Sequence, residues 1–184
     1  MATQFFTASS VDGFIADPDN SLSWLLSRDV DADGPMSYAG FIESVGALVM
    51  GATTYRWVVE HEIGEDGGKP WPYDIPCWVY SHRDLPRVGG DVRFVHGSVP
   101  ATHAEMVAAA GGRNVWVVGG GDLAGQFADA GLLDEVWVQY APVTLGAGAP
   151  LLPRRLELRL EEVARNADFA CVRYSVQSGP AGGA

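Results

Sequence analysis

The chain has 184 residues, of which 47% are hydrophobic, so it can bury the core of one sizeable domain. Its net charge of −11 argues against a general nucleic-acid or anionic-membrane binder, because either would need a basic face. No apolar stretch approaches the length of a membrane span, and the N-terminus lacks the layout of a signal peptide, so we expect a cytoplasmic protein.

The first half of the chain predicts strands that alternate with helices and loops. Hydrophobic periodicity and the positions of Gly and Pro set the expected boundaries. In chain order these are a strand at 3–8, a long loop at 9–34, a helix at 35–46, a strand at 47–50, a short helix at 53–59 and a solvent loop at 61–75. A loop as long as the first one inside a compact domain is usually functional.

The second half predicts more strands and ends in a hairpin. A capping box at Thr102–Glu105 predicts the start of one helix, and another is expected from the glycines near 120 to Gly131. The expected strands lie at 77–80, 92–95, 115–118, 133–145, 156–163 and 169–176. This order indicates an α/β fold whose sheet is mostly parallel, with an antiparallel C-terminal edge. We expect a single domain over 1–177 and a disordered tail at 178–184, which is made of small and helix-breaking residues.

Three consecutive glycines, Gly119, Gly120 and Gly121, stand between an apolar strand and the start of a helix. Glycines let the backbone approach a ligand closely, and the unpaired N–H groups of a helix start attract anions. The alternative is a tight strand-to-helix turn that binds nothing. Because ligands of α/β folds lie at the carboxyl ends of strands, we favour a phosphate site.

Two further strand ends carry polar groups suited to a nucleotide. Thr53 and Thr54 follow one strand, and Ser81, His82 and Arg83 follow another. Their hydroxyls and cations suit phosphate oxygens, and the ends of parallel strands meet at one edge of a sheet. Three such loops together predict a dinucleotide site.

Other constellations are weaker. His61–Glu62 with Glu65–Asp66 could bind a metal, but a solvated acidic loop is the simpler interpretation. Ser81 and His82 lack the elbow motif of a hydrolase. Cys77 and Cys171 are expected to be buried thiols. The aromatic residues between 57 and 78 suit either a stacking pocket or the core; they are Trp57, Trp71, Tyr73 and Trp78.

The order of several motifs resembles the dihydrofolate reductase superfamily, above all the reductase domains of riboflavin biosynthesis and their stand-alone relatives. The motifs are Ser10–Asp17, Val49–Tyr55, Trp78–Arg83, Val117–Leu123, Gly131–Glu135 and Pro142–Pro150. The resemblance implies a three-layer fold with helices on both faces of the sheet. It also implies NADPH-dependent hydride transfer to a pterin- or pyrimidine-like heterocycle, similar to the reduction of 5-amino-6-(5-phosphoribosylamino)uracil.

The same resemblance implies which residues form the site. Those expected to bind the cofactor are Ala8, Ile15, Asn20, Ser21, Leu22, Gly51, Thr53, Thr54, Ser81, His82, Arg83, Gly119, Gly120, Gly121, Asp122 and Leu123. Those expected beside the substrate are Trp24, Ser37, Tyr38 and Phe41. No proton donor and no metal ligand is assigned. The loop at 9–24 would close over the cofactor.

Three positions depart from the folate reductases. Ala52 replaces the usual cation at the 2′-phosphate, so His82 or Arg83 would have to compensate. Asp122 puts a carboxylate beside the pyrophosphate, and we expect its side chain to turn aside. Ser37 stands where those enzymes keep a carboxylate, so dihydrofolate is not the expected substrate.

Two expectations concern the whole molecule. A non-catalytic, regulatory nucleotide-binding module of the same fold remains the alternative to an enzyme. The resemblance also implies a symmetric homodimer through the C-terminal half, where the segment 136–145 is long, apolar and β-rich.

Overall fold

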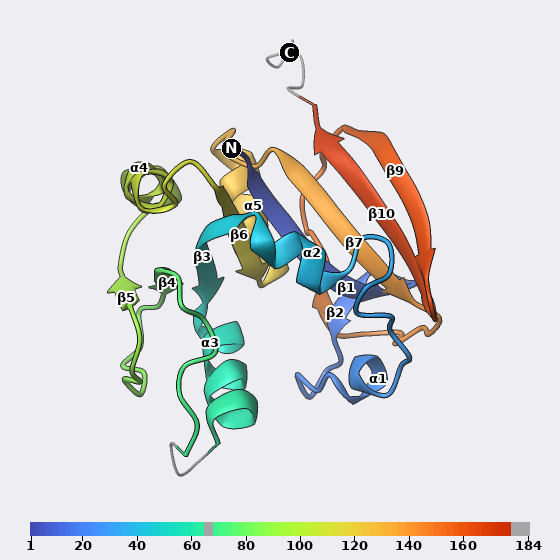
Figure 1. Cartoon of the computed structure of the whole chain (residues 1–184), viewed down its shortest axis with the longest axis horizontal. Helices are drawn as coiled ribbons and strands as arrows, with labels where there is room; N and C mark the ends of the chain where they lie inside the picture. Colours follow the sequence, from blue (N-terminus) through green and yellow to red (C-terminus); the bar gives the residue numbers. More distant parts are fainter. Residues whose placement is uncertain (65–67, 178–184) are drawn as a thin grey trace.

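The structure, a computed structural model, describes residues 1–64 and 68–177, so the expected tail at 178–184 lies outside it. An eight-stranded sheet runs through the molecule in the order β5-β4-β3-β6-β1-β7-β10-β9 (Figure 1). Its strands are β1 (Thr3–Ser10), β3 (Val45–Gly51), β4 (Cys77–Tyr80), β5 (Val92–Val95), β6 (Asn114–Gly119), β7 (Glu135–Ala141), β9 (Leu158–Asn166) and β10 (Phe169–Val176). A separate two-stranded ladder joins β2 (Phe14–Ala16) to β8 (Ala149–Pro150).

The sheet is parallel except at its C-terminal edge. β1 pairs in parallel with β6 and β7, and β3 pairs in parallel with β4 and β6. β10 is antiparallel to both β7 and β9. The predicted mixed sheet is therefore confirmed, and the carboxyl ends of β3, β4 and β6 lie along one edge.

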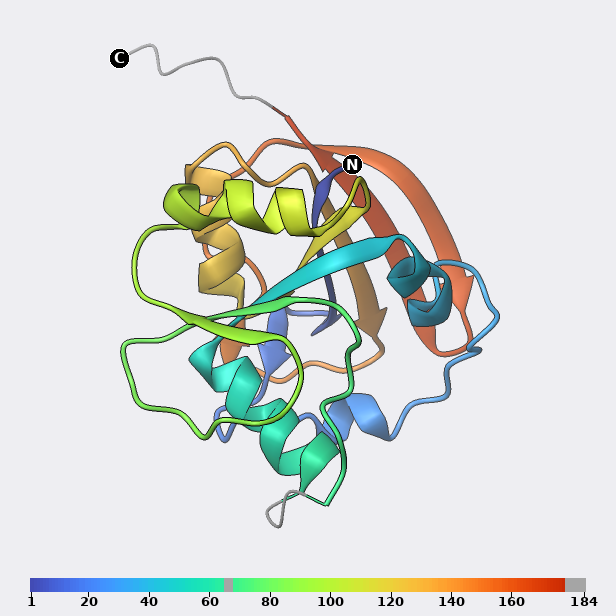
Figure 2. The same ribbon diagram turned by 60° about the vertical axis from the view of Figure 1, so that its left-hand side comes forward.

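Helices cover both faces of this sheet. They are α1 (Ser23–Leu26), α2 (Tyr38–Glu43), α3 (Ala52–Val58), which continues as the π-helical turn η1 (Val59–Ile63), α4 (Val99–Ala109) and α5 (Gly121–Asp129). Successive residues of a strand point to opposite faces, and the adjacent Phe5 and Phe6 of β1 accordingly enter different cores. Phe5 shares its core with Met106 of α4 and Phe127 of α5, which lie side by side in Figure 2. Phe6 shares the other with α2 and α3, so the predicted three layers are confirmed.

Several predicted boundaries were wrong for local reasons. The second helix begins at Tyr38 rather than Pro35, because Met36 has a left-handed φ of 54° and Ser37 is the N-cap. The predicted capping box at Thr102 does not form. Helix α4 begins at Val99, after Ser98, and the Thr102 hydroxyl forms a hydrogen bond with the hydroxyl of Tyr80 instead.

Other segments also differ from their expected state. The long loop at 9–34 contains β2 and α1, and the segment expected to be a solvent loop from 61 begins inside η1. The strand expected at 133–145 ends at Ala141. Within the described residues, no helix has the length and apolar character needed to cross a membrane. Both cysteines are buried and unpaired, as expected.

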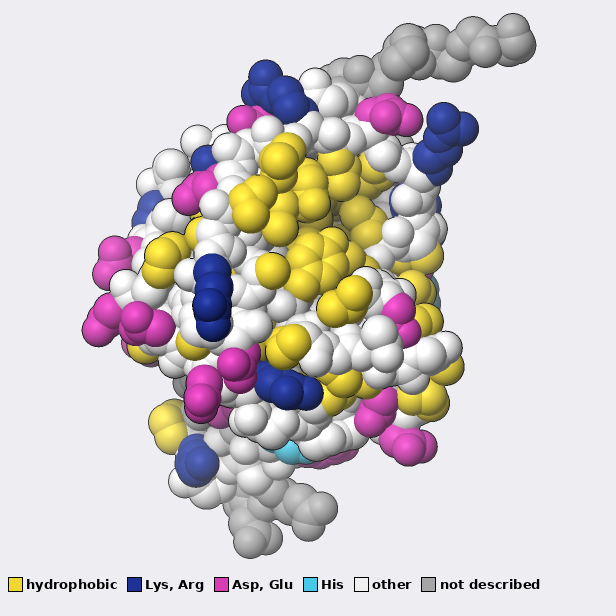
Figure 3. Space-filling model, turned by 90° about the vertical axis from the view of Figure 1, so that its right-hand side faces the viewer, with side chains coloured by type: hydrophobic (Ala, Val, Ile, Leu, Met, Phe, Trp, Pro, Cys, Tyr) yellow, Lys and Arg dark blue, Asp and Glu magenta, His cyan; other side chains and the backbone are white. Residues whose placement is uncertain are grey.

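The C-terminal hairpin leaves one apolar surface uncovered. Residues Leu158, Leu160 and Val163 of β9 are 38%, 55% and 63% exposed. They lie opposite Val176, Tyr174 and Val172 of β10 and so share one face of the sheet with them. Figure 3, which views the side of the molecule where β9 and β10 lie, shows apolar side chains gathered there.

Candidate active site

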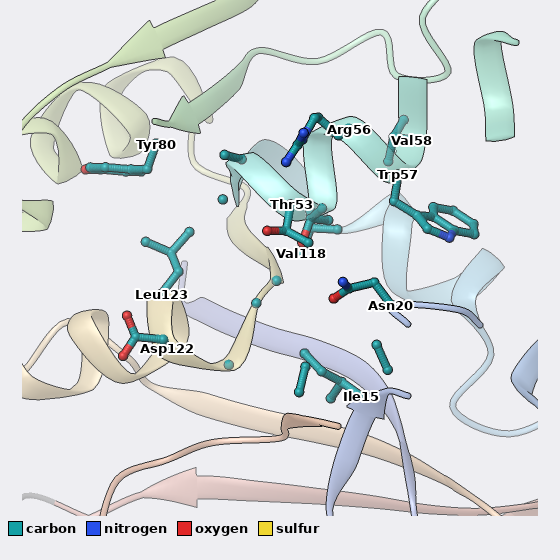
Figure 4. A pocket seen from close by; sticks show the side chains of 18 of the residues that line it. Ile15, Asn20, Thr53, Arg56, Trp57, Val58, Tyr80, Val118, Asp122 and Leu123 are labelled. Atoms are coloured by element: carbon teal, nitrogen blue, oxygen red, sulfur yellow. The ribbon is translucent and has the colours of Figure 1, made fainter. Parts of the chain in front are cut away.

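A cleft of about 1140 Å³ opens at the carboxyl edge of the parallel strands. Every residue predicted to bind the cofactor lines this cleft except Ala8, which is a half-buried residue of β1. Three strand ends reach it: Gly51 ends β3, Ser81 follows β4 and Gly119 ends β6. Figure 4 shows Asp122 and Leu123 at one end of the cleft, Trp57 and Asn20 at the other, and Thr53 between them.

The three glycines are required for different reasons. Gly119 has a φ of +153°, which side chains rarely tolerate. A Cβ at Gly121 would collide with the backbone carbonyls of Pro150 and Leu151, so Gly121 serves the packing of the protein itself. Gly120 differs: its φ of −80° suits any residue, and a Cβ there would meet only Ile15 Cδ1, at 4.0 Å. The fold therefore leaves open space in front of Gly120.

The N-terminus of α5 presents backbone N–H groups beside this space. Gly120 is the N-cap and has no side chain to accept hydrogen bonds, so the first amides of the helix lack an intrahelical partner. The Asp122 carboxylate accepts from Gln126 Nε2 (3.0 Å) and from an Arg154 guanidinium nitrogen (3.1 Å). The hydrogen bond from Gln126, and then that from Arg154, lowers the pKa of Asp122. The carboxylate is thus ionised but partnered within the protein.

The loop after β4 is shaped by Ser81. Its buried hydroxyl donates to the Arg83 carbonyl and accepts from the Arg83 amide, both at 2.9 Å. The hydroxyl is therefore occupied by the turn and positions Arg83. His82 and Arg83 are exposed on the wall of the cleft, where they can meet an anion.

Some residues of the cleft were not assigned to the cofactor or substrate by the sequence analysis. Arg56, Trp57, Glu60, His61 and Tyr73 line it; Trp57 and Tyr73 were expected either in a stacking pocket or in the core, and Glu60 and His61 reach it because α3 continues into η1. The rings of Trp57 and His61 stack with centroids 4.4 Å apart and planes 10° apart, and His61 Nδ1 lies 2.9 Å from the Trp57 carbonyl oxygen. The i, i+4 spacing of these two residues on a helix was the available signal.

The remaining aromatic residues of that region belong to the core. Trp71 and Trp78 are buried in the core, whereas Trp57 and Tyr73 line the cleft. Each of the two interpretations of these aromatic residues therefore applies to two of the four. Burial raises the pKa of Tyr73, which keeps its phenol neutral. Of the weaker metal-binding candidate, Glu65 and Asp66 lie outside the described residues, and in the part of the chain that the structure describes no group of three potential metal ligands includes His61 or Glu62.

The four residues expected beside the substrate do not line the cleft. Trp24 is buried against Ala141 and Phe169 in a small separate core. Phe41 stacks on Phe6 with ring centroids 4.3 Å apart. The Ser37 hydroxyl accepts a hydrogen bond from the Gly40 amide and so caps α2. Both Phe41 and Ser37 border a second hollow of about 580 Å³, at the opposite ends of the strands.

Tyr38, the fourth of these residues, also lies outside the cleft. It is 44% exposed and packs beside Phe6 and Trp116. None of Trp24, Ser37, Tyr38 and Phe41 therefore lines this cleft, whereas Arg56, Trp57, Glu60 and His61 of α3 and η1 do. Of the residues of α2, Phe41 packs in the core, whereas Tyr38 is exposed.

Asp12 is not suited to donate a proton. Its carboxylate accepts from the Ser10 hydroxyl (2.6 Å) and from the amides of Leu145 and Gly146. The Ser10 bond, and then the backbone amides, lower the pKa of Asp12 to about 2, so it is ionised at neutral pH. It ties the β1–β2 turn to the loop after β7.

Comparison with known proteins identifies relatives along most of the chain. The RibD C-terminal domain family matches residues 99–168. The uncharacterized protein YwjB of Bacillus subtilis (strain 168) is 30% identical over 164 residues, covering 86% of this chain and 88% of that protein. A protein from Shewanella sp. PV-4, provisionally assigned to riboflavin biosynthesis, has 28% identity and a TM-score of 0.79, over 96% of this chain and 99% of that one.

More distant structures share the fold. Dihydrofolate reductase from Enterococcus faecalis, complexed with NADP(H), has 15% identity and a TM-score of 0.56, over 96% of this chain and 97% of that one. The combined deaminase and 5-amino-6-(5-phosphoribosylamino)uracil reductase of Thermotoga maritima has 15% identity and a TM-score of 0.60, over 96% of this chain and 56% of that one. This chain therefore belongs to the RibD C-terminal domain family and has the dihydrofolate reductase-like fold.

Proposed function

We propose that the protein is an NADPH-dependent reductase of a small planar heterocycle of the pterin or pyrimidine kind. The proposed reaction is similar to the reduction of 5-amino-6-(5-phosphoribosylamino)uracil. Bound NADPH would supply the hydride. The protein would bind and orient both molecules and exclude water from the reacting atoms.

The open space in front of Gly120 is the observation that carries this proposal. A single added Cβ would project into it without meeting the protein closely, so the glycine serves something other than packing. The amides at the start of α5 suit a pyrophosphate, and the hydroxyls of Thr53 and Thr54 suit its other side. His82 and Arg83 would meet the 2′-phosphate that distinguishes NADPH from NADH.

Space beyond the expected nicotinamide position favours an enzyme over a regulatory module. Ile15 and the segment 20–22 would frame the nicotinamide. The same cleft is also lined by Trp57 and Tyr73, and Figure 4 shows Trp57 beyond Asn20, at the end away from Asp122. A nucleotide-binding module without a reaction would have no need of these additional aromatic walls.

Replacement of Gly120 tests the cofactor site. Gly120→Val should fold but lose NADPH binding by calorimetric titration, because its methyl groups would occupy the phosphate space. Gly89→Val is the matched control: Gly89 also has free space for a Cβ, and it lies outside the cleft. Thermal unfolding of both variants checks the fold. A folded Gly120→Val protein with undiminished NADPH affinity would refute the proposed site.

The substrate calls for a direct search. A panel of pteridines and aminopyrimidines, followed by the loss of NADPH absorbance, should identify a compound whose reduction depends on the enzyme. Gly120→Val should abolish that signal. If NADPH binds and no panel member is reduced, the regulatory module gains support.

We also propose a symmetric homodimer through the uncovered apolar face of β9 and β10. The exposed Leu160 and Val163 at the centre of this face would be costly to leave in water. Light scattering should report a dimer at micromolar concentration and a monomer for Leu160→Glu. Leu26→Glu, at an exposed leucine of α1, is the control and should stay dimeric.

A further inference from the structure

We propose that the aromatic end of the cleft takes a planar heterocycle that bears N–H donors and carries no phosphate. By the aromatic end we mean Trp57, Glu60, His61 and Tyr73, together with Asp19 and Asn20. The inference rests on the proposed reductase function and assigns its substrate class. It separates this protein from reductases whose pyrimidine substrate is a phosphoribosyl compound.

The walls of this end suit a flat ring. Trp57 and His61 form a parallel stack along one helical turn, and both line the cleft together with Tyr73. Aromatic walls bind planar heterocycles through offset stacking and exclude water around them. Figure 4 shows Trp57 and Asn20 at the same end of the cleft, next to the expected nicotinamide position. A ring held there would lie beside the cofactor.

The charges at this end oppose a phosphate. Among the lining residues that the structure describes, Arg56 and Arg83 are the only Lys or Arg. Arg83 belongs to the turn after β4, and Arg56 lies on the Thr53 side of α3, turned away from Trp57 in Figure 4. The aromatic end instead contributes the carboxylates of Asp19 and Glu60. A phosphate dianion there would meet two like charges.

The same carboxylates can recognise amino groups. In the described part of the chain, neither Asp19 nor Glu60 forms an ion pair or accepts a side-chain hydrogen bond. Glu60 stands one residue before His61, on the turn that forms the aromatic stack. A carboxylate at the rim of a stacking surface accepts N–H bonds from ring amines, and such charge-assisted bonds are strong. The substrate class that fits is therefore an unphosphorylated amino-heterocycle.

A matched pair of ligands tests this inference by binding alone. The probes are 5-amino-6-(ribosylamino)uracil and its 5′-phosphate, titrated calorimetrically into the protein saturated with NADP⁺. We expect the unphosphorylated compound to bind about tenfold more tightly, because the carboxylates of Asp19 and Glu60 repel the phosphate. Glu60→Gln should reduce this preference, whereas Glu62→Gln, on the same turn but outside the cleft lining, should keep it. Trp57→Ala should weaken both ligands, and Trp57→Phe should restore part of the loss.

The outcomes separate this inference from the proposed function. If NADP⁺ binds but the phosphate ester binds as tightly as the free compound or more tightly, the substrate class is wrong and the reductase proposal stands. The same holds if NADP⁺ binds and neither compound does. If NADP⁺ itself does not bind to the folded wild-type protein, the proposed function fails.

Discussion

The two ends of the cleft recognise ligands by different means. The phosphate end is built from backbone: the glycine turn after β6 and the amides at the start of α5. The aromatic end is built from side chains of one continuous helical segment, α3 with η1, whose Trp57 and His61 stack on each other. Backbone recognition needs small residues at fixed places in the sequence, whereas side-chain recognition needs a helix to be laid against the cleft at one angle. The phosphate end can therefore be predicted from the local sequence, whereas the aromatic end depends on tertiary packing.

The largest expected effect separates two neighbouring glycines of the phosphate end. Gly121→Ala would push a Cβ into the carbonyls of Pro150 and Leu151 and should destabilise the fold by about 3 kcal/mol. Gly120→Ala has room and an ordinary φ, so its stability should equal or exceed wild type by up to about 1 kcal/mol. Urea unfolding measures both. Similar losses in the two variants would mean that Gly120 also serves packing.

The next effect concerns cofactor choice at the phosphate end. Replacing His82 and Arg83 together by Ala should weaken NADPH binding by about 1.5–3 kcal/mol, the range of hydrogen bonds to charged groups. NADH lacks the 2′-phosphate and should be affected much less. Titration of both cofactors into the wild type and the double variant gives the comparison. Equal losses for NADPH and NADH would contradict the assignment of these two residues.

A smaller effect is expected in the loop that reaches the aromatic end. Residues 17–22 should exchange their amide hydrogens about tenfold more slowly with saturating NADPH, equal to about 1.4 kcal/mol, because Asn20 and its neighbours line the cleft. The turn at 10–14 is already held through Asp12 and should change little. If the hydrogen-exchange rates of residues 17–22 do not change with NADPH, the loop does not close over the cofactor.

The smallest effect concerns the anchor of that loop. The pKa of Asp12 in the folded protein is about 2, below its ordinary 3.8, so its stabilising contribution is complete above about pH 4 and is lost as the pH falls through 2. The difference in unfolding temperature between wild type and Asp12→Asn should therefore shrink as the pH is lowered from about 4 to about 2. A difference that stays constant over that range would exclude the ionised carboxylate as the anchor.

Much of the fold follows from periodicity and chain order. The strands at 77–80 and 92–95 and the strand–glycine–helix unit at 114–129 lie where the sequence predicts them, and the closing hairpin forms with its first strand at Leu158–Asn166 in place of 156–163. These segments have strong alternation or clear glycine boundaries. Three boundaries were predicted wrongly. The helix near Met36 starts later because Met36 has a left-handed backbone, and the helix near Thr102 starts earlier because its N-cap is Ser98. The strand expected to reach 145 ends at Ala141.

The sequence by itself determined the phosphate end of the cleft, because consecutive glycines after an apolar strand constrain the local backbone whatever surrounds it. Only the tertiary structure decided the aromatic end. Helical continuation past Val58 turns His61 onto Trp57, and the packing of α2 directs Phe41 to the core and away from the cleft. Which face of a short helix meets solvent is fixed by its neighbours across the sheet, and those neighbours are far away in the chain.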